Sequence, residues 1–458
     1  MKNLRITTYL LAGLLLLGFT ACEEDEAIPV RVNFSNTEAG ISQSSPSADI
    51  EISFSRPAEA DGSLSISIAS ETLTYGESAD FYTSPLATEN VITLPYTVGD
   101  ESVLITVMAG SALNIEQDES ITLTVSDPAQ ILDLGDQTEF TVMFSENFVA
   151  LSGTVVLDAG GPTFSHQAYF DLSKITQTKV DKYTWDLGFS TAGDHRVIIN
   201  NPAKMMAQQI DKNDLTKVTA QDTVGFGAAQ NFGAYNGDAV DWVDAPDGDL
   251  DSLALNKVLA TATDNKVYIV NREGDGRNWK KIRILQNGTG YTVQYADIAS
   301  STFQTADITV DESYNFSFFD LDNGATTVEP EKNSWDLMYG SFTNVVNFGY
   351  NVPYAYNDYV IINRNNTEVA EIVLADNVSY DGYALSDAQA LTLTAAQNAI
   401  GSNWRNGGSQ TTAPSLKEDR FYVIKDAADN YYKLKFTSML SAENGDRGYT
   451  SIQYQLLK

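Results

Sequence analysis

Alternation of apolar and polar residues dominates the chain between Val30 and Asn147. Segments such as "ADIEISFS", "SLSISIAS" and "SITLTVSD" place an apolar residue at every second position. This is the period of a β-strand with one buried face. Turn residues separate six or seven such segments, and this succession predicts a β-sandwich over residues 30–148.

An internal repeat organises the rest of the chain. The segment "AYFDLSKITQTKVDKYTWDLGF" near residue 170 is answered by "SFFDLDNGATTVEPEKNSWDLMY" near residue 319. Each copy continues with a hairpin pattern, at 266–285 and 420–439, and closes with "GYTVQY" or "GYTSIQY". Four blocks in one order at similar spacing predict two homologous β-rich domains, residues 151–302 and 303–458.

One segment departs from the strand pattern. "SDAQALTLTAAQNAI", residues 386–400, is rich in alanine, and Leu391, Ala395 and Ile400 fall near one helical face. Ser386 is a suitable N-cap. The sequence therefore predicts an all-β protein, a sandwich followed by two tandem β-rich domains, with a minor helix.

The N-terminus has the features of an export signal. Two basic residues precede an apolar run at 10–19 that is too short to span a bilayer. Cys22, the only cysteine, stands where a bacterial lipobox places the residue that is lipidated. We expect a lipoprotein signal peptide over 1–22, with an ordinary signal peptide and an incidental cysteine as the alternative.

Residues 23–29 form an acidic linker that begins with "EEDE". Acidic residues directly after a lipidated cysteine resemble the tags that send Bacteroidetes lipoproteins to the cell surface. The alternative is a merely solvated linker. We expect a protein held to the outer membrane by its lipid alone and exposed at the cell surface.

Composition narrows the classes of function. The chain has 61 acidic residues against 28 basic ones and a pI near 4.2, which argues against nucleic-acid binding. Two histidines and one cysteine provide no HExxH, CxxC or GxSxG motif, so we expect no enzyme. A glycosidase with two carboxylates among the 61 acids is the remaining alternative.

The sandwich region resembles Calx-beta-like domains. The segments that carry the resemblance are "ADFYTS", "ITLPYTVGDESVLITV" and "QDESITLTVSDP". Some members of that family bind Ca²⁺, and Asp80, Asp118 and Glu119 match family positions. The family's run of adjacent aspartates is missing, and Ca²⁺ requires six to eight oxygen ligands. We therefore expect a structural spacer and no calcium site.

The repeated region resembles the HmuY family in two tandem copies. The aromatic "YF" or "FF" strand, the "WD" strand and the closing hairpin carry the resemblance. It implies an all-β surface lipoprotein of Bacteroidetes that captures haem through two axial His or Met side chains. It also implies transfer of haem, free or from a haem protein, to an outer-membrane transporter.

The resemblance places the haem ligands between the WD block and the closing hairpin. In the first copy that stretch offers only Met205 and Met206, and the second copy offers tyrosines but neither His nor Met. His166 and His195 lie outside the stretch. All four are candidate axial ligands, although core packing explains the methionines equally well and a strand face or a turn explains the histidines.

Two functions therefore stay open. One is a surface lipoprotein that binds haem or a related porphyrin for nutrient acquisition. The other is a surface protein for adhesion or for glycan or protein binding, which keeps the HmuY-like fold without haem ligation. The repeat favours the first, and the shortage of ligands favours the second.

Overall fold

The computed structural model describes residues 30–458 except 44, 116, 128, 130, 131, 147, 227–236, 376, 377, 409–411 and 442–444. The predicted signal peptide, Cys22 and the acidic linker therefore lie outside the described residues. Within the described part of the chain, no helix combines the length and the hydropathy needed to cross a bilayer.

Ten strands form the N-terminal part: β1 (Arg31–Phe34), β2 (Glu38–Ile41), β3 (Ser47–Phe54), β4 (Gly62–Ser70), β5 (Phe81–Ser84), β6 (Val91–Tyr96), β7 (Ser102–Ala109), β8 (Glu119–Ser126), β9 (Asp133–Leu134) and β10 (Glu139–Phe144). They make two five-stranded sheets in the orders β5-β7-β3-β1-β9 and β2-β10-β8-β4-β6. Alternate residues such as Ile50, Ile52 and Phe54 are buried in one apolar core. The predicted alternation thus produces a sandwich.

The strands of the repeated region are β11 (Ser152–Asp158), β12 (His166–Asp171), β13 (Thr176–Asp181), β14 (Leu187–Ser190), β15 (Val197–Ile199), β16 (Met206–Ile210), β17 (Val267–Asn271), β18 (Lys280–Asn287), β19 (Gly290–Asp297), β20 (Gln304–Ile308), β21 (Phe316–Asp320), β22 (Gly324–Thr326), β23 (Leu337–Asn347), β24 (Asn351–Ile362), β25 (Glu368–Val373), β26 (Arg405–Asn406), β27 (Ser415–Leu416), β28 (Arg420–Lys425), β29 (Tyr431–Ser438) and β30 (Tyr449–Leu456). The helices are η1 (Gly161–Thr163), η2 (Leu215–Lys217), η3 (Ala220–Thr223), η4 (Gly237–Trp242), η5 (Ala262–Asp264) and α2 (Leu385–Gln389). The chain is thus all-β with minor helix, as predicted.

The same pair of sheets occurs twice in this region. One pair has the orders β20-β19-β18-β17-β16 and β22-β21-β14-β15, and the other has β11-β30-β29-β28-β25 and β13-β12-β23-β24. The first pair is built from residues 187–326, which we call the inner unit. The second pair is built from residues 152–181 and 337–458, which we call the outer unit. The names refer to the sequence, in which the two stretches of the outer unit flank the inner unit.

Strand pairing crosses the predicted boundary between the two copies. The first three strands of the first copy, β11 to β13, complete the outer unit, whereas β20 to β22 of the second copy complete the inner unit. Each copy therefore lends three strands to the other. Because the strands are equivalent, the exchange preserves the same pairings in both units. The sequence boundaries 151–302 and 303–458 stay a prediction about the repeat, and they differ from the boundaries of the sheets.

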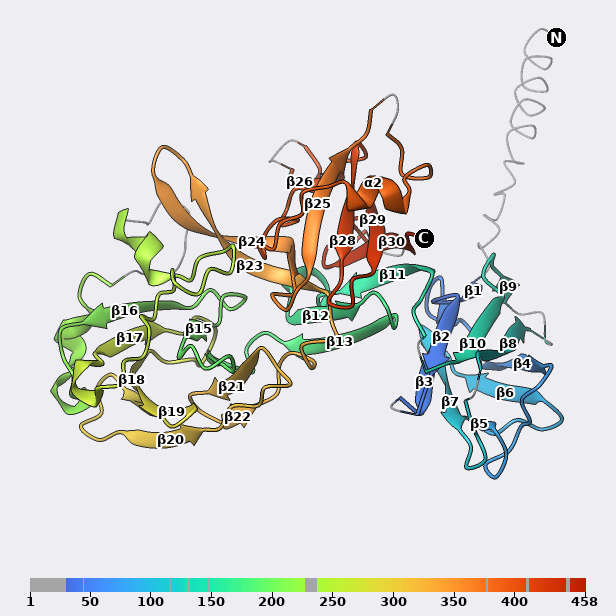
Figure 1. Ribbon diagram of the computed structural model, residues 1–458, viewed down its shortest axis with the longest axis horizontal. Coiled ribbons are helices and arrows are strands. Elements are labelled where there is room, and N and C mark those ends of the chain that lie inside the picture. The colour runs from blue at the N-terminus through green and yellow to red at the C-terminus, as the bar shows by residue number, and fades with distance from the viewer. Residues whose placement is uncertain are drawn as a thin grey trace, which may run out of the picture.

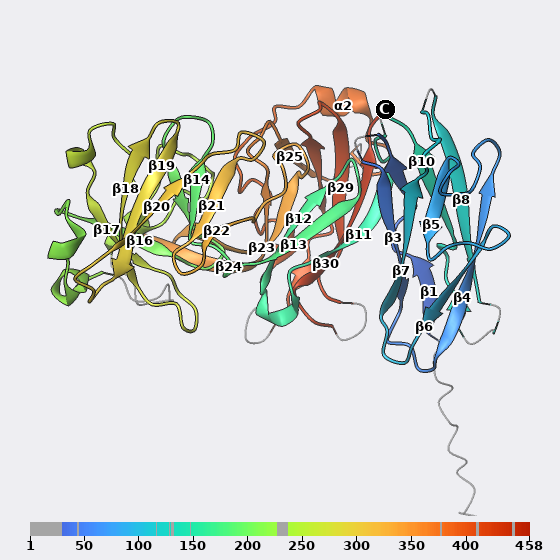
Figure 2. The same cartoon turned by 90° about the horizontal axis from the view of Figure 1, so that it is seen from below.

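The parts lie in a row, with the sandwich at one end, the outer unit in the middle and the inner unit at the other end (Figures 1 and 2). The chain passes from outer to inner unit at residues 182–186 and returns at 327–336. Each passage ends in a Trp-Asp pair. The repeated motif therefore lies where the two units meet.

The predicted helix over 386–400 is wrong beyond its first turn. Helix α2 ends at Gln389, and Thr394 instead exchanges two backbone hydrogen bonds with Val369. The β-branched threonines at 392 and 394 lower helix propensity, and the bridge to the sheet supplies the backbone partners that a helix would have supplied. Ser386 is not the N-cap, because that position belongs to Ala384.

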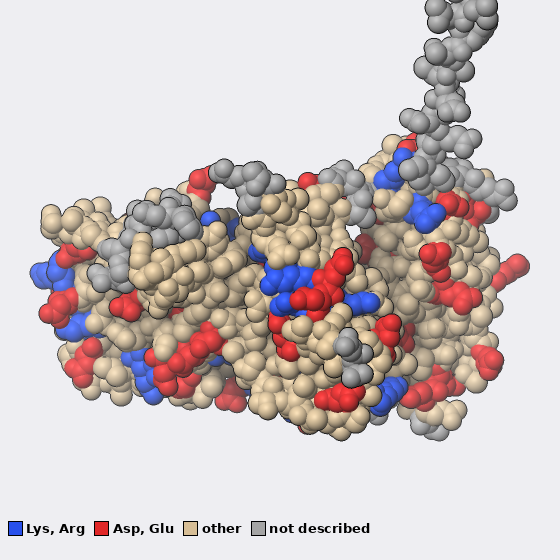
Figure 3. Space-filling model, turned by 90° about the horizontal axis from the view of Figure 1, so that it is seen from above, with Lys and Arg blue, Asp and Glu red and all other residues tan. Residues whose placement is uncertain are grey.

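Acidic side chains are spread along the whole face shown in Figure 3, and basic side chains lie beside them at several places. Exposed pairs such as Arg420 with Asp419 and Glu371 are of this kind. Exposed pairs contribute little stability each. The acidic surface agrees with the net charge of −33.

Candidate functional site

The two Trp-Asp motifs hold equivalent positions at the junction of the units. The backbone N–H of Leu321 donates to Asp186 at 2.7 Å, and the N–H of Leu172 donates to Asp336 at 2.8 Å. Asp186 thereby holds the hairpin of β21 and β22 in the inner unit, and Asp336 holds the hairpin of β12 and β13 in the outer unit. The repeat is thus visible in single hydrogen bonds as well as in strand order.

The residues after the motifs match in the same way. The side-chain amide of Asn200 donates to the carbonyl oxygens of Lys182 and Trp185, and that of Asn363 donates to those of Lys332 and Trp335. Both asparagines are buried. These bonds satisfy carbonyl groups at the two passages of the chain between the units.

The two indole rings pack against aromatic residues at the junction of the units. Trp185 packs edge-on against Phe318, with ring centroids 4.9 Å apart, and Trp335 packs in the same way against Tyr169 at 5.0 Å. These rings belong to one buried apolar cluster that draws residues from both units. Aromatic pairs in this geometry stabilise beyond the area they bury.

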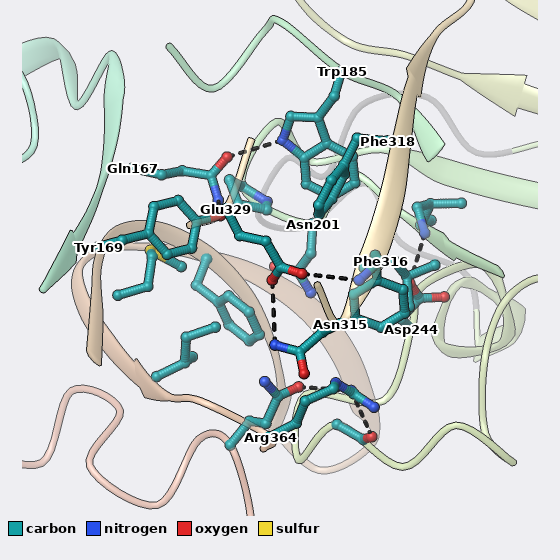
Figure 4. Close-up of a pocket in the computed structure, with 18 of the residues that line it drawn as sticks. Gln167, Tyr169, Trp185, Asn201, Asp244, Asn315, Phe316, Phe318, Glu329 and Arg364 are labelled. Atoms are coloured by element: carbon teal, nitrogen blue, oxygen red, sulfur yellow. Dashed lines mark hydrogen bonds between the residues drawn. The ribbon is translucent and has the colours of Figure 1, made fainter. Parts of the chain in front are cut away.

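A cavity lies within this junction, between the sheets β13-β12-β23-β24 and β22-β21-β14-β15, and we call it the inter-sheet cavity (Figure 4). Its volume is about 90 Å³. Both tryptophans line it, together with aromatic and aliphatic residues of β12, β15, β21, β23 and β24. Half-buried Asn201, Ala245 and Gly248 lie at its edge.

A buried carboxylate points into the middle of the cavity (Figure 4). Glu329 accepts a hydrogen bond from the backbone N–H of Phe316 at 2.9 Å and a longer one, at 3.5 Å, from the side chain of Asn315. Burial raises the pKa of Glu329 to about 7, although both hydrogen bonds act in the opposite direction. Glu329 is therefore an acceptor whose charge changes near neutral pH.

Arg364 forms the opposite side of the cavity. Its guanidinium donates to the carbonyl oxygen of Gly248 at 3.0 Å and to Gln397 at 2.9 Å, and it lies 4.9 Å from the ring centroid of Phe316. Burial lowers the pKa of Arg364, and the carboxylate of Glu329 opposes that shift. Gly248 has φ +83°, and a Cβ there would collide with Gln397, so the loop reaches Arg364 only with glycine.

A second buried acid, Asp244, holds the wall of the cavity. It accepts from the N–H groups of Ile199 at 2.8 Å and Ala254 at 3.0 Å. Burial raises the pKa of Asp244 to about 7. Since both oxygens bind backbone, Asp244 fixes the loop that carries Gly248.

The structure places the two candidate methionines in separate cores. Met205 is 1% exposed in the apolar cluster of the inner unit, and Met206 is 0% exposed in a different cluster beside Trp242. The two adjacent side chains therefore pack into different clusters, as neighbouring residues of an extended chain do. Neither lines the inter-sheet cavity.

His195 is a turn residue with a left-handed backbone, φ 55°. Its ring packs edge-on against Tyr291 at 5.4 Å, and its carbonyl oxygen accepts from Val258. Asp194 accepts from the N–H of Arg196, so it serves the turn. Among the described residues, the Nδ1 atom of His195 has no hydrogen-bond partner.

His166 begins β12 in the outer unit and is only half-buried, whereas Ala168 on the same strand is buried. Phe164 is also buried, but it lies before the strand, at the end of η1. Its Nδ1 atom likewise has no partner in the described part of the chain. His166 and His195 belong to different units. The four candidate ligands therefore do not meet at one position, and whether any of them binds haem stays a prediction.

Of the three acidic residues that match Calx-beta family positions, Asp80 has a role in local structure. Asp80 accepts from the backbone N–H of Thr74 at 2.7 Å. The described residues contain no group of three or more His, Cys, Asp or Glu arranged to hold a metal ion.

Sequence reasoning missed the charged residues of the cavity. Glu329 lies six positions before Trp335, in a connection that has no counterpart acid in the first copy. Arg364 directly follows Asn363, whereas Asn201 directly follows Asn200 in the first copy. An alignment of the two copies would have marked both residues, because each differs between the copies and lies near a residue that the copies share.

The family model described as HmuY protein matches residues 312–454. No curated protein matches the chain. The matched part covers less than half of the 458 residues, and a second HmuY copy at 151–302 stays a prediction.

Several solved structures are similar to the chain. The apo-form Calx CBD1 domain is 15% identical, with 26% of this chain and 99% of that domain covered and a TM-score of 0.21. A putative lipoprotein from Bacteroides fragilis NCTC 9343 is 13% identical, with 67% and 90% covered and a TM-score of 0.18. A two-domain protein with unknown function from the same organism is 9% identical, with 73% and 94% covered and a TM-score of 0.21.

Proposed function

We propose that this chain is a non-catalytic binding protein of the cell surface and that its ligand occupies the inter-sheet cavity. The observation that carries the proposal is the cavity itself, which both repeated tryptophans line together with the buried carboxylate of Glu329 and the half-buried guanidinium of Arg364. Apolar walls with a few convergent polar groups and a perturbed acid are typical of a binding site. The HmuY match over 312–454 supports a binding protein and not an enzyme.

Haem binding is the second candidate, and the HmuY match favours it. In that case the chain would pass haem to an outer-membrane transporter. Two observations weigh against the inter-sheet cavity as the haem site. Its volume of about 90 Å³ is far below that of pockets for drug-sized molecules, which is roughly 300–1,000 Å³. The four candidate ligands also lie outside it.

A haemin titration of the mature protein, followed by absorbance under oxidising and reducing conditions, separates the two candidates. We expect no saturable Soret shift that depends on the candidate ligands. A saturable shift that disappears in Met205→Ala, Met206→Ala, His166→Ala or His195→Ala would establish haem binding and refute our first proposal. The fold of each variant is checked by circular dichroism, because both methionines are buried.

We also propose that Cys22 anchors the protein to the outer membrane through a lipid. The lipobox position and the acidic residues that follow it support this proposal. Mass spectrometry of the membrane-bound protein should find a diacylglyceryl-modified N-terminal peptide. A soluble secreted form with an unmodified cysteine would contradict it.

A further inference from the structure

The two tryptophans of the cavity differ in one respect. The indole N–H of Trp185 donates to the side-chain oxygen of Gln167 at 2.9 Å. The indole N–H of Trp335, a residue only 4% exposed, has no acceptor anywhere in the described chain. A buried donor without a partner costs about 1–3 kcal/mol. The wall of the cavity therefore holds a donor that the protein leaves unused.

Arg364 supplies a second unused donor. Two of its bonds go to Gly248 and Gln397, but its Nε atom is buried and has no partner among the residues that the structure describes. Glu329 supplies the opposite chemistry, since a carboxylate with two oxygens accepts more bonds than the two that Phe316 and Asn315 provide. The cavity thus offers both donors and an acceptor.

The charges around the cavity argue for a neutral ligand. An anion would meet the carboxylate of Glu329, and a cation would meet the guanidinium of Arg364. Burying a further charge that is not fully paired is strongly unfavourable. A neutral hydroxyl group, in contrast, accepts from an indole N–H and donates to a carboxylate at the same time.

Size and walls restrict the ligand further. A cavity of roughly 150 Å³ holds one benzene molecule, so about 90 Å³ suits a smaller group. Apart from the polar groups above and from Asn201 and Asp244, the walls are mainly aromatic and aliphatic, including Trp185, Phe316 and Phe318. Such walls pack against the C–H groups of a small carbon skeleton.

From this arrangement we infer that the inter-sheet cavity binds a small neutral hydroxylated group, with the N–H of Trp335 as donor and Glu329 as acceptor. The group is either a free short polyol or the hydroxylated edge of a sugar. The inference rests on the proposed function, because it assumes that the cavity is the binding site.

The test is a ligand-detected NMR titration of the full mature protein at millimolar ligand. The probes are ethylene glycol and glycerol as free polyols, and methyl glucoside and methyl mannoside as molecules that insert only an edge. Trp335→Phe keeps an aromatic ring and removes the unused donor, and we expect it to weaken binding about 10-fold. Trp404→Phe is the matched control, because it removes another buried indole N–H that has no partner among the described residues but lies outside the cavity, and we expect a change of less than about 3-fold.

Glu329→Gln is a second variant in case Trp335→Phe does not fold, and it should weaken the same probes by about 10-fold. Binding of the polyols with this pattern supports a free polyol, and binding of the glycosides alone supports a sugar edge. No variant-sensitive binding of any of the four probes overturns the inference. Binding of acetate or ethylammonium with the same loss in Trp335→Phe overturns the hydroxylated ligand but leaves the proposed site standing.

Discussion

Asp186 and Asp336 hold the same place in the two copies of one motif, yet their electrostatic surroundings are opposite. In the inner unit, Arg272 lies 2.8 Å from Asp186 and 3.7 Å from Asp320, and Arg277 also pairs with Asp186. Arg272 is 1% exposed, so these are buried ion pairs. Removing one partner of a buried ion pair is strongly destabilising, because it leaves the other charge buried without compensation.

In the described part of the outer unit, no arginine or lysine forms an ion pair with Asp336. Arg272 directly follows β17, and the residue that directly follows the equivalent strand β28 is Asp426. Asp336 therefore faces two further carboxylates, Asp171 and Asp426. Burial raises the pKa of Asp336 well above its usual range, and Asp171 raises it further. One scaffold thus carries an ion-paired carboxylate in one unit and, in the other, a carboxyl whose pKa is raised by burial and by a neighbouring carboxylate.

The comparison of the two units depends on the exchange of strands between the copies. Dividing the chain into two fragments tests this exchange, and the outcome is all-or-none. Residues 30–302 and 303–458 would be co-expressed as separate fragments, one of them tagged. Because β11 to β13 pair with β23 and β30, and β20 to β22 pair with β14 and β19, the fragments should co-purify as one particle.

Size-exclusion chromatography of the purified fragments provides the measurement. Independent tandem domains would separate into two species, and that result would contradict the exchange.

The next largest effect concerns the two aspartates themselves. Asp186→Asn leaves Arg272 and Arg277 without their buried partner and should lower the free energy of unfolding by about 3–5 kcal/mol. Asp336→Asn breaks no ion pair among the described residues, so it should change the free energy of unfolding by less than about 1 kcal/mol at neutral pH. Urea unfolding of both variants measures the difference. Equal losses would mean that the two positions are electrostatically alike.

A smaller effect is the pH dependence of stability that Glu329 produces. Its pKa is about 7 in the folded protein against an ordinary value of 4.5. The folded state therefore holds the proton more tightly, and this contribution to stability is complete below about pH 4.5 and is lost as the pH rises to about 7. Glu329→Gln removes the titration, so its stability relative to the wild type should rise over this range by up to about 3 kcal/mol.

Thermal or urea unfolding between pH 4.5 and 8 checks this prediction. A Glu329→Gln variant whose stability runs parallel to that of the wild type would contradict it. Glu331→Gln, in the same connection but exposed, is the matched control, and its stability should run parallel to that of the wild type.

Much of the fold was readable from local pattern. Period-two alternation predicted the sandwich strands, because each strand there has one buried and one exposed face. The repeat predicted the doubled set of sheets, because "FDL" and "WDL" recur with the same contacts around Asp186 and Asp336. The prediction of a helix over 386–400 was wrong because it gave more weight to the alanine content than to the β-branched threonines.

The site was less accessible to sequence reasoning. The candidates Met205, Met206, His166 and His195 were chosen by residue type, since type is what decides metal ligation. Burial and partner residues decide whether a side chain is available, and neither is a local property. Glu329 and Arg364 belong to no motif, so only their convergence on one cavity marks them.

The sequence by itself determined that this protein is all-β and contains a repeat with two Trp-Asp motifs, because strand period and self-similarity are properties of neighbouring residues. The tertiary structure alone decided which copy completes which sheet. Equivalent strands offer the same pairings within a copy or between copies, so local pattern cannot distinguish the two. That choice brings both tryptophans to one junction, and it leaves one indole N–H paired and the other unused.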